Sequence, residues 1–216
     1  MIHRRTLAAG LAAGLALLAA LPTAPARAST ELENGARSFV ESLAKQAVDS
    51  LADHKISRPE RSVRFRRLFN DSFAVEVIGR WILGRHWRTA TEAEQTEYLR
   101  LFEDLMVVSY VDRFAEYAGE ALKVHRAVTE NESTATIFSE IVRPNGGPPV
   151  RVDWRVGRNK AEAYKIVDVV VEGTSMSNTM RADFTSVINQ KGGQISGLIE
   201  VLREKTAQLK QEAERK

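Results

Sequence analysis

Few residues in this chain have neighbours that would support catalysis. Ser175 lies in the segment Gly173-Thr174-Ser175-Met176-Ser177, but a hydrolase elbow needs a glycine at the position that Ser177 occupies. The sequence contains no cysteine, so it offers no thiolate nucleophile, thiolate metal site or disulfide. It also lacks a phosphate-binding loop, a dinucleotide fingerprint and a His-Glu-x-x-His motif. We therefore expect no catalytic residues, no metal and no cofactor.

Asp168 is the acidic residue whose sequence context could belong to an active site. It interrupts an apolar series formed by Ile166, Val167, Val169, Val170 and Val171. A carboxyl group in such a strand can act as a general base with a raised pKa, as in some small α+β cavity enzymes. More often, such an acid faces solvent or accepts hydrogen bonds from a neighbouring loop. A small cavity enzyme that uses Asp168 is therefore an alternative function.

The first 28 residues have the pattern of an export signal. Arg4 and Arg5 precede an apolar run from Leu7 to Leu21, and Ala26-Arg27-Ala28 offers small residues for cleavage before Ser29. A bilayer span needs roughly 20 apolar residues, so this shorter run favours removal over retention as an anchor. The adjacent arginines also resemble a twin-arginine signal, which leaves the export route open.

Removal of this segment changes the charge balance of the protein. The full chain has 31 Lys and Arg residues against 28 Asp and Glu residues. Arg4, Arg5 and Arg27 leave with the signal and no acid leaves with them, so the mature chain has 28 basic residues against 28 acidic ones. Because a near-neutral chain has no general attraction for polyanions, we exclude nucleic acid as a partner.

Apolar residues at helical spacing predict four helices before Gly119. The first spans 32–51, the second has a cap at Ser57, and the third spans 74–83 and ends at Gly84. The third is almost wholly apolar, so we expect it to be buried on most sides. Thr91 and Glu94 form a capping box for the longest helix, which continues to about residue 117. Its broad apolar surface fits either neighbours on two sides or one side that lines a cavity.

The second half of the chain predicts strands followed by two helices. Segments 122–129, 134–143, 150–158 and 163–172 are rich in Val, Ile and Thr, and their short links permit an antiparallel meander. Ser177 or Asn178 can cap the next helix, and a last helix begins near Ile195. We expect an α+β fold with a four-stranded antiparallel meander and about six helices that enclose an apolar pocket. Residues 29–205 form one domain, and 206–216 a charged tail that frays.

The predicted elements carry more apolar and aromatic surface than a thin sheet and a few helices need for a core. Two acyl chains of about thirty methylenes involve roughly 24 kcal/mol of transfer free energy, so a protein that carries them must cover them. For each candidate lining residue, ordinary core packing is an equal alternative. The residues predicted to line a lipid pocket are Trp81, Met106, Tyr110, Trp154, Val169, Val171, Met176 and Phe184.

Three segments in order resemble the MlaC or toluene-tolerance family of periplasmic lipid carriers. The first is Ile82-Leu83-Gly84-Arg85-His86-Trp87-Arg88-Thr89-Ala90-Thr91. The second is Val142-Arg143-Pro144-Asn145-Gly146-Gly147-Pro148-Pro149-Val150-Arg151-Val152-Asp153. The third is Ile166-Val167-Asp168-Val169-Val170-Val171-Glu172-Gly173-Thr174-Ser175-Met176. The likeness covers approximately residues 65–203, and three ordered motifs are more specific than any one of them.

This resemblance implies a periplasmic carrier that holds phospholipid tails between its sheet and its helices and performs no catalysis. The partners it implies are an inner-membrane ABC transporter with a ring of MCE domains and an outer-membrane lipoprotein complex. Thr174 and Ser177 stand where the family usually has apolar residues, so a sterol-like or hopanoid cargo is an alternative to phospholipid. A periplasmic chaperone for outer-membrane proteins is a third possible function.

Overall fold

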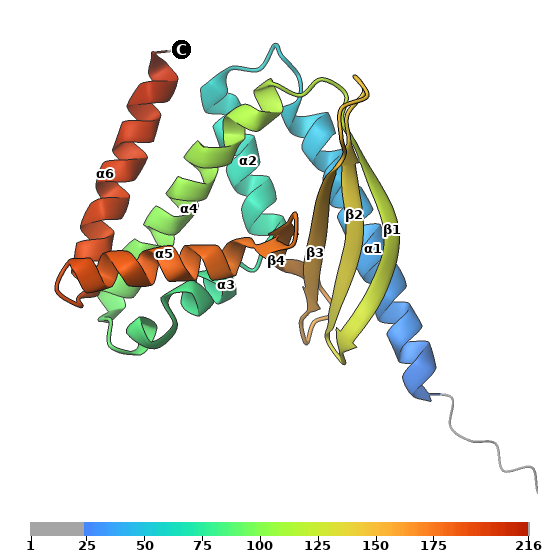
Figure 1. Cartoon of the computed structure of the whole chain (residues 1–216), viewed down its shortest axis with the longest axis horizontal. Coiled ribbons are helices and arrows are strands. Elements are labelled where there is room, and N and C mark those ends of the chain that lie inside the picture. The colour runs from blue at the N-terminus through green and yellow to red at the C-terminus, as the bar shows by residue number, and fades with distance from the viewer. Residues whose placement is uncertain (1–23, 216) are drawn as a thin grey trace, which may run out of the picture.

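The computed structural model describes residues 24–215, shown as the coloured ribbon in Figure 1. Within this range the chain has six α-helices, one 3-10 helix and one five-stranded sheet. The helices are α1 (Ala24–Leu51), α2 (Arg58–Ser72), α3 (Val75–Leu83), η1 (Gly84–Arg88), α4 (Glu92–Ala115), α5 (Met176–Gln190) and α6 (Ile195–Glu214). The strands are β1 (Ala121–Asn131), β2 (Thr134–Val142), β3 (Val150–Arg158), β4 (Tyr164–Val171) and β5 (Thr174–Ser175).

The sheet is an antiparallel meander in the order β1-β2-β3-β4-β5. The predicted α+β class is confirmed, but the predicted count of four strands is wrong because β5 adds a short fifth strand. A tight turn at Glu172 and Gly173, whose φ angles are 49° and 81°, folds β5 back on β4. Such a turn matches the twist of a hairpin. Two residues carry no periodicity, which explains why the sequence did not predict β5.

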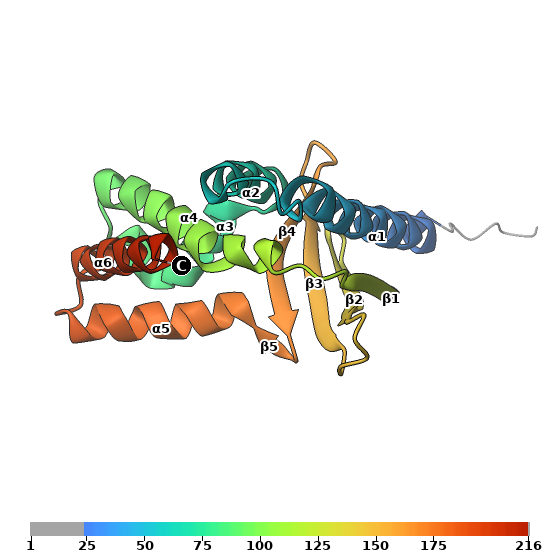
Figure 2. The same cartoon turned by 90° about the horizontal axis from the view of Figure 1, so that it is seen from above.

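Helix α1 lies along one face of the sheet, and the remaining helices gather at the other end of the molecule (Figures 1 and 2). The sheet face towards α1 is apolar and includes Ala135, Ile137, Val156 and Ile166, all fully buried. Alternate residues point to the opposite, outer face, which carries ion pairs such as Arg155–Glu130 at 3.2 Å. The sheet is therefore covered by α1 on one face and charged on the other.

Two hydrophobic clusters hold these parts together. The sheet cluster combines Leu32, Ala36, Val40 and Leu43 of α1 with the buried side chains of β2, β3 and β4. The helical cluster is built by α2, α3, α4, α5 and α6, with Tyr98 and Phe102 among its fully buried members. The two clusters are separate sets of buried residues, so any contact between them depends on partly buried side chains.

Helix α4 lies between α2 and α6 and contacts both (Figures 1 and 2). Arg66 of α2 forms an ion pair with Asp104 at 2.6 Å, and Arg203 of α6 pairs with Glu97. Apolar side chains of α4 also enter the helical cluster. Neighbours on two sides therefore account for the broad apolar surface of this helix, one of the two explanations that the sequence left open.

The predicted helix starts at Ser57 and Thr91 are confirmed. The Ser57 side chain accepts a hydrogen bond from the Glu60 N–H at 3.3 Å. Thr91 and Glu94 make both bonds of a capping box. Caps depend on residues within one turn of each other, so a local pattern is sufficient to identify them.

Three other helical expectations are corrected by the structure. Helix α3 is buried on one side only, since Val77 and Trp81 are 60% and 53% exposed. Helix α5 is capped by Ser175, not by Ser177 or Asn178. Helix α6 continues to Glu214 through the predicted tail, where the Thr206 hydroxyl is buried and donates to the carbonyl of Leu202 at 2.8 Å.

Most of the predicted signal, residues 1–23, lies outside the described residues. Residues 24–28 form the start of α1. Across the described part of the chain, no helix combines the length and the apolar character required for a membrane crossing.

Candidate functional site

Phe73 lies where the two hydrophobic clusters meet. Its side chain is partly buried and packs against both of them. It ends α2, and its backbone forms a bridge to Ile166 of β4. The next N–H, that of Ala74, donates to the Ile166 carbonyl at 2.9 Å. The chain between α2 and α3 is thus fixed to the edge of the sheet, and Phe73 marks the junction of helices and sheet.

An aromatic row extends from this junction along α2. Phe65, Phe69 and Phe73 are four residues apart, so they share one face of the helix. Ring centroids lie 4.8 Å apart for Phe69 and Phe73 and 6.2 Å apart for Phe65 and Phe69. Phe114 of α4 continues the row at 5.8 Å from Phe65. The sequence showed this spacing, but the phenylalanines were not included among the predicted pocket residues.

The structure distributes the eight predicted pocket residues over three environments. Met106 and Phe184 are buried in the helical cluster, and Tyr110 packs against it. Trp154 and Val169 face each other on neighbouring strands and pack against the sheet cluster. Trp81 lies outside both clusters and is largely exposed, while Val171 and Met176 are partly buried. Three of the eight thus belong to the helical cluster and two to the sheet cluster, and contact with a lipid stays a prediction for all of them.

The indole of Trp154 is fixed on the inner face of the sheet. Its Nε1–H donates to the Oγ of Ser139 at 3.1 Å. The Ser139 hydroxyl in turn donates to the carbonyl of Val152. Because the polar group of the indole has a partner within the sheet, the rest of the ring is available for apolar contacts. The ring is partly buried, so part of its apolar surface is open to a ligand.

Asp168 is occupied in holding the start of α5. Its Oδ1 accepts hydrogen bonds from the N–H groups of Val169 at 2.9 Å and Ser177 at 3.1 Å. Its Oδ2 accepts one from the Ser175 hydroxyl at 2.6 Å, and the Ser175 Oγ accepts from the Asn178 N–H at 3.1 Å. These contacts match the structural role that the sequence analysis gave as the more frequent one. They leave the carboxylate engaged with the backbone and with the cap of α5.

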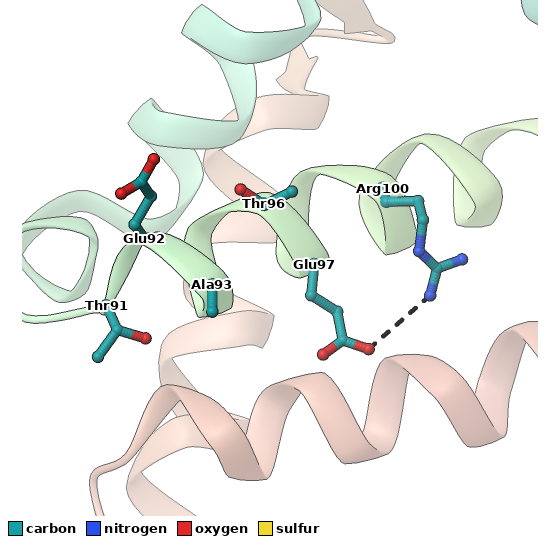
Figure 3. Close-up of a pocket in the computed structure, with 6 residues that line it drawn as sticks. All are labelled: Thr91, Glu92, Ala93, Thr96, Glu97 and Arg100. Atoms are coloured by element: carbon teal, nitrogen blue, oxygen red, sulfur yellow. Dashed lines mark ion pairs between the residues drawn. The ribbon is translucent and has the colours of Figure 1, made fainter.

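Two hollows in the described structure are lined mainly by polar side chains. The larger, of about 780 Å³, lies at the start of α4 and is shown in Figure 3. Its lining includes Glu92 and the pair Glu97–Arg100, separated by 3.8 Å. The second, of about 570 Å³, lies between α1 and α2 and is lined by residues such as Asp49 and Arg67. Charged walls are unsuited to acyl chains, and neither hollow contains a predicted pocket residue.

Burial also raises the pKa of two tyrosine hydroxyls in or beside the helical cluster. It raises the pKa of the Tyr110 hydroxyl, with Arg113 acting in the opposite direction. It also raises the pKa of Tyr98, whose hydroxyl donates to the Gly79 carbonyl at 3.1 Å. Both side chains are therefore neutral at physiological pH, which suits an apolar interior. Within residues 24–215, no group of His, Asp and Glu side chains is arranged to hold a metal ion.

Comparison with known proteins finds a family whose model matches more than half of this chain. A family model described as MlaC protein matches residues 41–204. The intermembrane phospholipid transport system binding protein MlaC of Haemophilus influenzae is 22% identical over 137 residues, which are 62% of this chain and 63% of that protein. The alignment thus spans less than two thirds of the relative's length.

A solved structure has the same fold. It is that of a phospholipid-binding protein from Ralstonia solanacearum in complex with a phospholipid. The TM-score is 0.73 and the identity 20%, over 81% of this chain and 98% of the other. At this low identity the match establishes the common architecture.

Proposed function

Because this chain belongs to the MlaC family, we propose that it is a carrier that binds phospholipid acyl chains and moves lipid between two membranes. The observation that carries the proposal is the match of the family model to residues 41–204, which extend from α1 into α6. The named relative is a binding protein for intermembrane phospholipid transport, and the solved relative was crystallised with a phospholipid. The function is thus binding and transport, and we expect no turnover.

The junction at Phe73 supports this proposal. Phe73 packs against both clusters, and Tyr110 of the helical cluster and Trp154 and Val169 of the sheet cluster add partly buried apolar surface. Each methylene withdrawn from water contributes about 0.8 kcal/mol, so an acyl chain gains from insertion between the two clusters. The polar hollows at α4 and between α1 and α2 offer no comparable gain.

The carrier would act in the periplasm after removal of residues 1–28. Its proposed partners are an inner-membrane ABC transporter with a ring of MCE domains and an outer-membrane lipoprotein complex. A released protein can exchange between two such complexes, whereas a retained anchor would confine it to one membrane.

Native mass spectrometry of the exported protein, purified from its own envelope, tests lipid binding. We expect a population whose added mass corresponds to one phospholipid, identified by extraction. A protein that is consistently free of lipid, and that takes none from phospholipid vesicles, would refute the carrier function.

A pair of matched variants locates the binding site. Val169→Glu introduces a charge on the inner sheet face, and Val128→Glu introduces the same charge on the outer face, where Val128 is 38% exposed. We expect lipid occupancy to fall at least about tenfold in the first variant and to stay unchanged in the second. Val169→Leu keeps an uncharged side chain at the same place, and thermal unfolding confirms that each variant is folded. Equal occupancy in all of them would place the lipid elsewhere.

A further inference from the structure

The most exposed tryptophan among the described residues lies on α3. Trp81 is 53% exposed, and Val77, one turn earlier, is 60% exposed. Ile78 and Ile82 on the other side of the helix are buried in the helical cluster. Large apolar side chains that remain together in water usually mark a contact surface. The orientation of α3 is thus fixed by its buried side, and the exposed side needs another explanation.

Arg181 lies against Trp81, and Arg80 and Arg85 lie near it in the sequence, on α3 and η1. The Arg181 guanidinium of α5 lies 4.7 Å from the centre of the Trp81 ring and donates to the Trp81 carbonyl at 3.3 Å. Arg80 pairs with Glu76 at 3.4 Å. Within the described residues, neither Arg181 nor Arg85 forms an ion pair. We name Val77, Arg80, Trp81, Arg85 and Arg181 the α3 ridge.

The charge of the α3 ridge differs from that of the whole protein. Helices α3, η1 and α5 together contain two acids, Glu76 and Asp183, against four arginines, whereas the chain from Ser29 onward has equal numbers of basic and acidic residues. The excess of positive charge is therefore local. It lies beside an indole and a valine, and this combination is typical of surfaces that contact an anionic membrane interface.

Two observations favour a lipid surface over a protein as the occupant. Indole rings favour the headgroup region of a bilayer, where guanidinium groups also find phosphate oxygens. Helix α3 packs beside α5 and β4, the elements that contain Met176 and Val171. A membrane contact at α3 would bring this end of the junction close to lipid.

We propose that the α3 ridge docks the protein on membrane surfaces that contain anionic phospholipid. This docking proposal rests on the carrier function proposed above. Docking on a membrane and binding of a lipid are nevertheless separate properties that can be measured independently. The ridge would hold the protein at the bilayer while lipid enters or leaves. Arg181 keeps the Trp81 ring in place, because it contacts both the ring and the backbone of the same residue.

Vesicle cosedimentation with the processed protein tests the docking surface. The probes are vesicles of phosphatidylcholine alone and of phosphatidylcholine mixed with phosphatidylglycerol, each at low and high salt. We expect binding to the mixed vesicles, and we expect salt to weaken it because salt screens exposed charges. The variant Val77→Ser with Arg85→Gln should bind about tenfold more weakly, since one basic residue at an anionic surface contributes about fivefold.

Helix α2 offers a matched control. Val63 is 58% exposed, and Arg67 of the same helix forms no ion pair within the described residues. The variant Val63→Ser with Arg67→Gln makes the same chemical changes outside the α3 ridge and should bind like the unmodified protein. A Trp81→Phe variant adds an independent measurement, because it should lose most of the blue shift in tryptophan emission on vesicle binding.

Several results would overturn the docking proposal. One is equal binding to both kinds of vesicle, and another is an equal loss in the α2 and α3 variants. Unchanged vesicle binding of the α3 variant, together with lost crosslinks to an envelope protein, would assign the ridge to a protein partner instead. A protein that docks through the ridge but carries no lipid by native mass spectrometry would refute the carrier function and leave the docking surface in place.

Discussion

Asp168 joins the end of the sheet to the start of α5, and this contact can be measured by a single substitution. Asp168→Asn replaces an oxygen acceptor by an amide donor, so it cannot accept from both the Ser175 hydroxyl and the Ser177 N–H as before. We expect the free energy of unfolding to fall by about 1–2 kcal/mol, the usual effect of losing a cap. Urea denaturation measures this change.

Asp183 of α5 supplies the control, since its side chain is exposed. Asp183→Asn should change the unfolding free energy by less than about 0.5 kcal/mol. Equal stability of the two variants would show that the carboxylate of Asp168 is not needed as a cap. The cavity-enzyme alternative would then regain its catalytic candidate.

His86 gives a pH-dependent prediction at the same scale. Partial burial, followed by the charge of Arg85, lowers the pKa of this imidazole below 6.5. The fold therefore favours the neutral ring. The contribution of His86 to stability is complete above about pH 6.5, the pKa in the unfolded chain. It is lost as the pH falls through the lower pKa of the folded state.

An NMR titration of His86 measures this pKa directly. The midpoint should lie below 6.5 and rise in Arg85→Gln, but not fully return, because burial is the larger cause. Arg64→Gln on α2 should leave the midpoint unchanged. A midpoint above 6.5 in the unmodified protein would contradict the described environment.

At the scale of elements, the close contact of α1 with β4 depends on Gly35. A Cβ atom at this position would overlap with Oη of Tyr164 and lie 2.5 Å from its Cζ, and the Tyr164 ring stacks on Phe39. Gly35→Ala should therefore destabilise the protein by about 1–3 kcal/mol, although alanine in a helix usually gains about 0.5–1 kcal/mol over glycine. Thermal and urea unfolding measure the net effect.

A second substitution separates the steric effect from the helical one. In a Tyr164→Ala background the obstacle is removed, so Gly35→Ala should become neutral or stabilising. Asn34→Ala, at an exposed neighbouring position, should have little effect in either background. If Gly35→Ala stabilises the unmodified protein, the packing of α1 on Tyr164 is looser than described.

The sequence predicted those elements whose signals are local. The caps at Ser57 and Thr91 and the four longer strands depend on neighbouring residues, and the structure confirms them. The cap of α5 was misplaced because Ser175, Ser177 and Asn178 are all good capping residues, so the local pattern does not choose between them. The exposed face of α3 was missed because Val77 and Trp81 are themselves apolar, although Glu76 and Arg80, one turn apart, mark a polar side of the helix beside them.

The candidate site was less predictable than the fold. Trp154 and Val169 face each other across β3 and β4. Alternation of apolar and charged residues along β3 places Trp154 on the apolar face, but the apolar run of β4 does not show which face Val169 takes. Phe73 was not selected, because its position between the two clusters follows from a backbone bridge to Ile166, over ninety residues away in the sequence. Sequence patterns identify the apolar face of each element, but the junction between two clusters depends on how those elements pack.

At the scale of the whole molecule, the N-terminal part of α1 also protects the open edge of the sheet. The edge strand β1 has its Thr129 N–H bonded to Glu33 at 2.9 Å. The Thr129 hydroxyl contacts Ser29 as well, through a bond of 3.0 Å between the two hydroxyl oxygens. Unpaired strand edges promote association between chains, so these contacts disfavour edge-to-edge pairing of β1 with another chain.

These contacts begin at Ser29, the residue expected to follow signal cleavage, so processing and folding make a joint prediction. We expect Edman sequencing or intact-mass analysis of the exported protein to give an N-terminus at Ser29, which preserves both partners of Thr129. Glu33→Ala should then lower the unfolding free energy by about 1–2 kcal/mol, because the Thr129 N–H loses its acceptor. Glu31→Ala, at an exposed position two residues earlier, should be nearly neutral. An N-terminus beyond Glu33 would contradict the prediction, since the mature protein would lack the residues that cover β1.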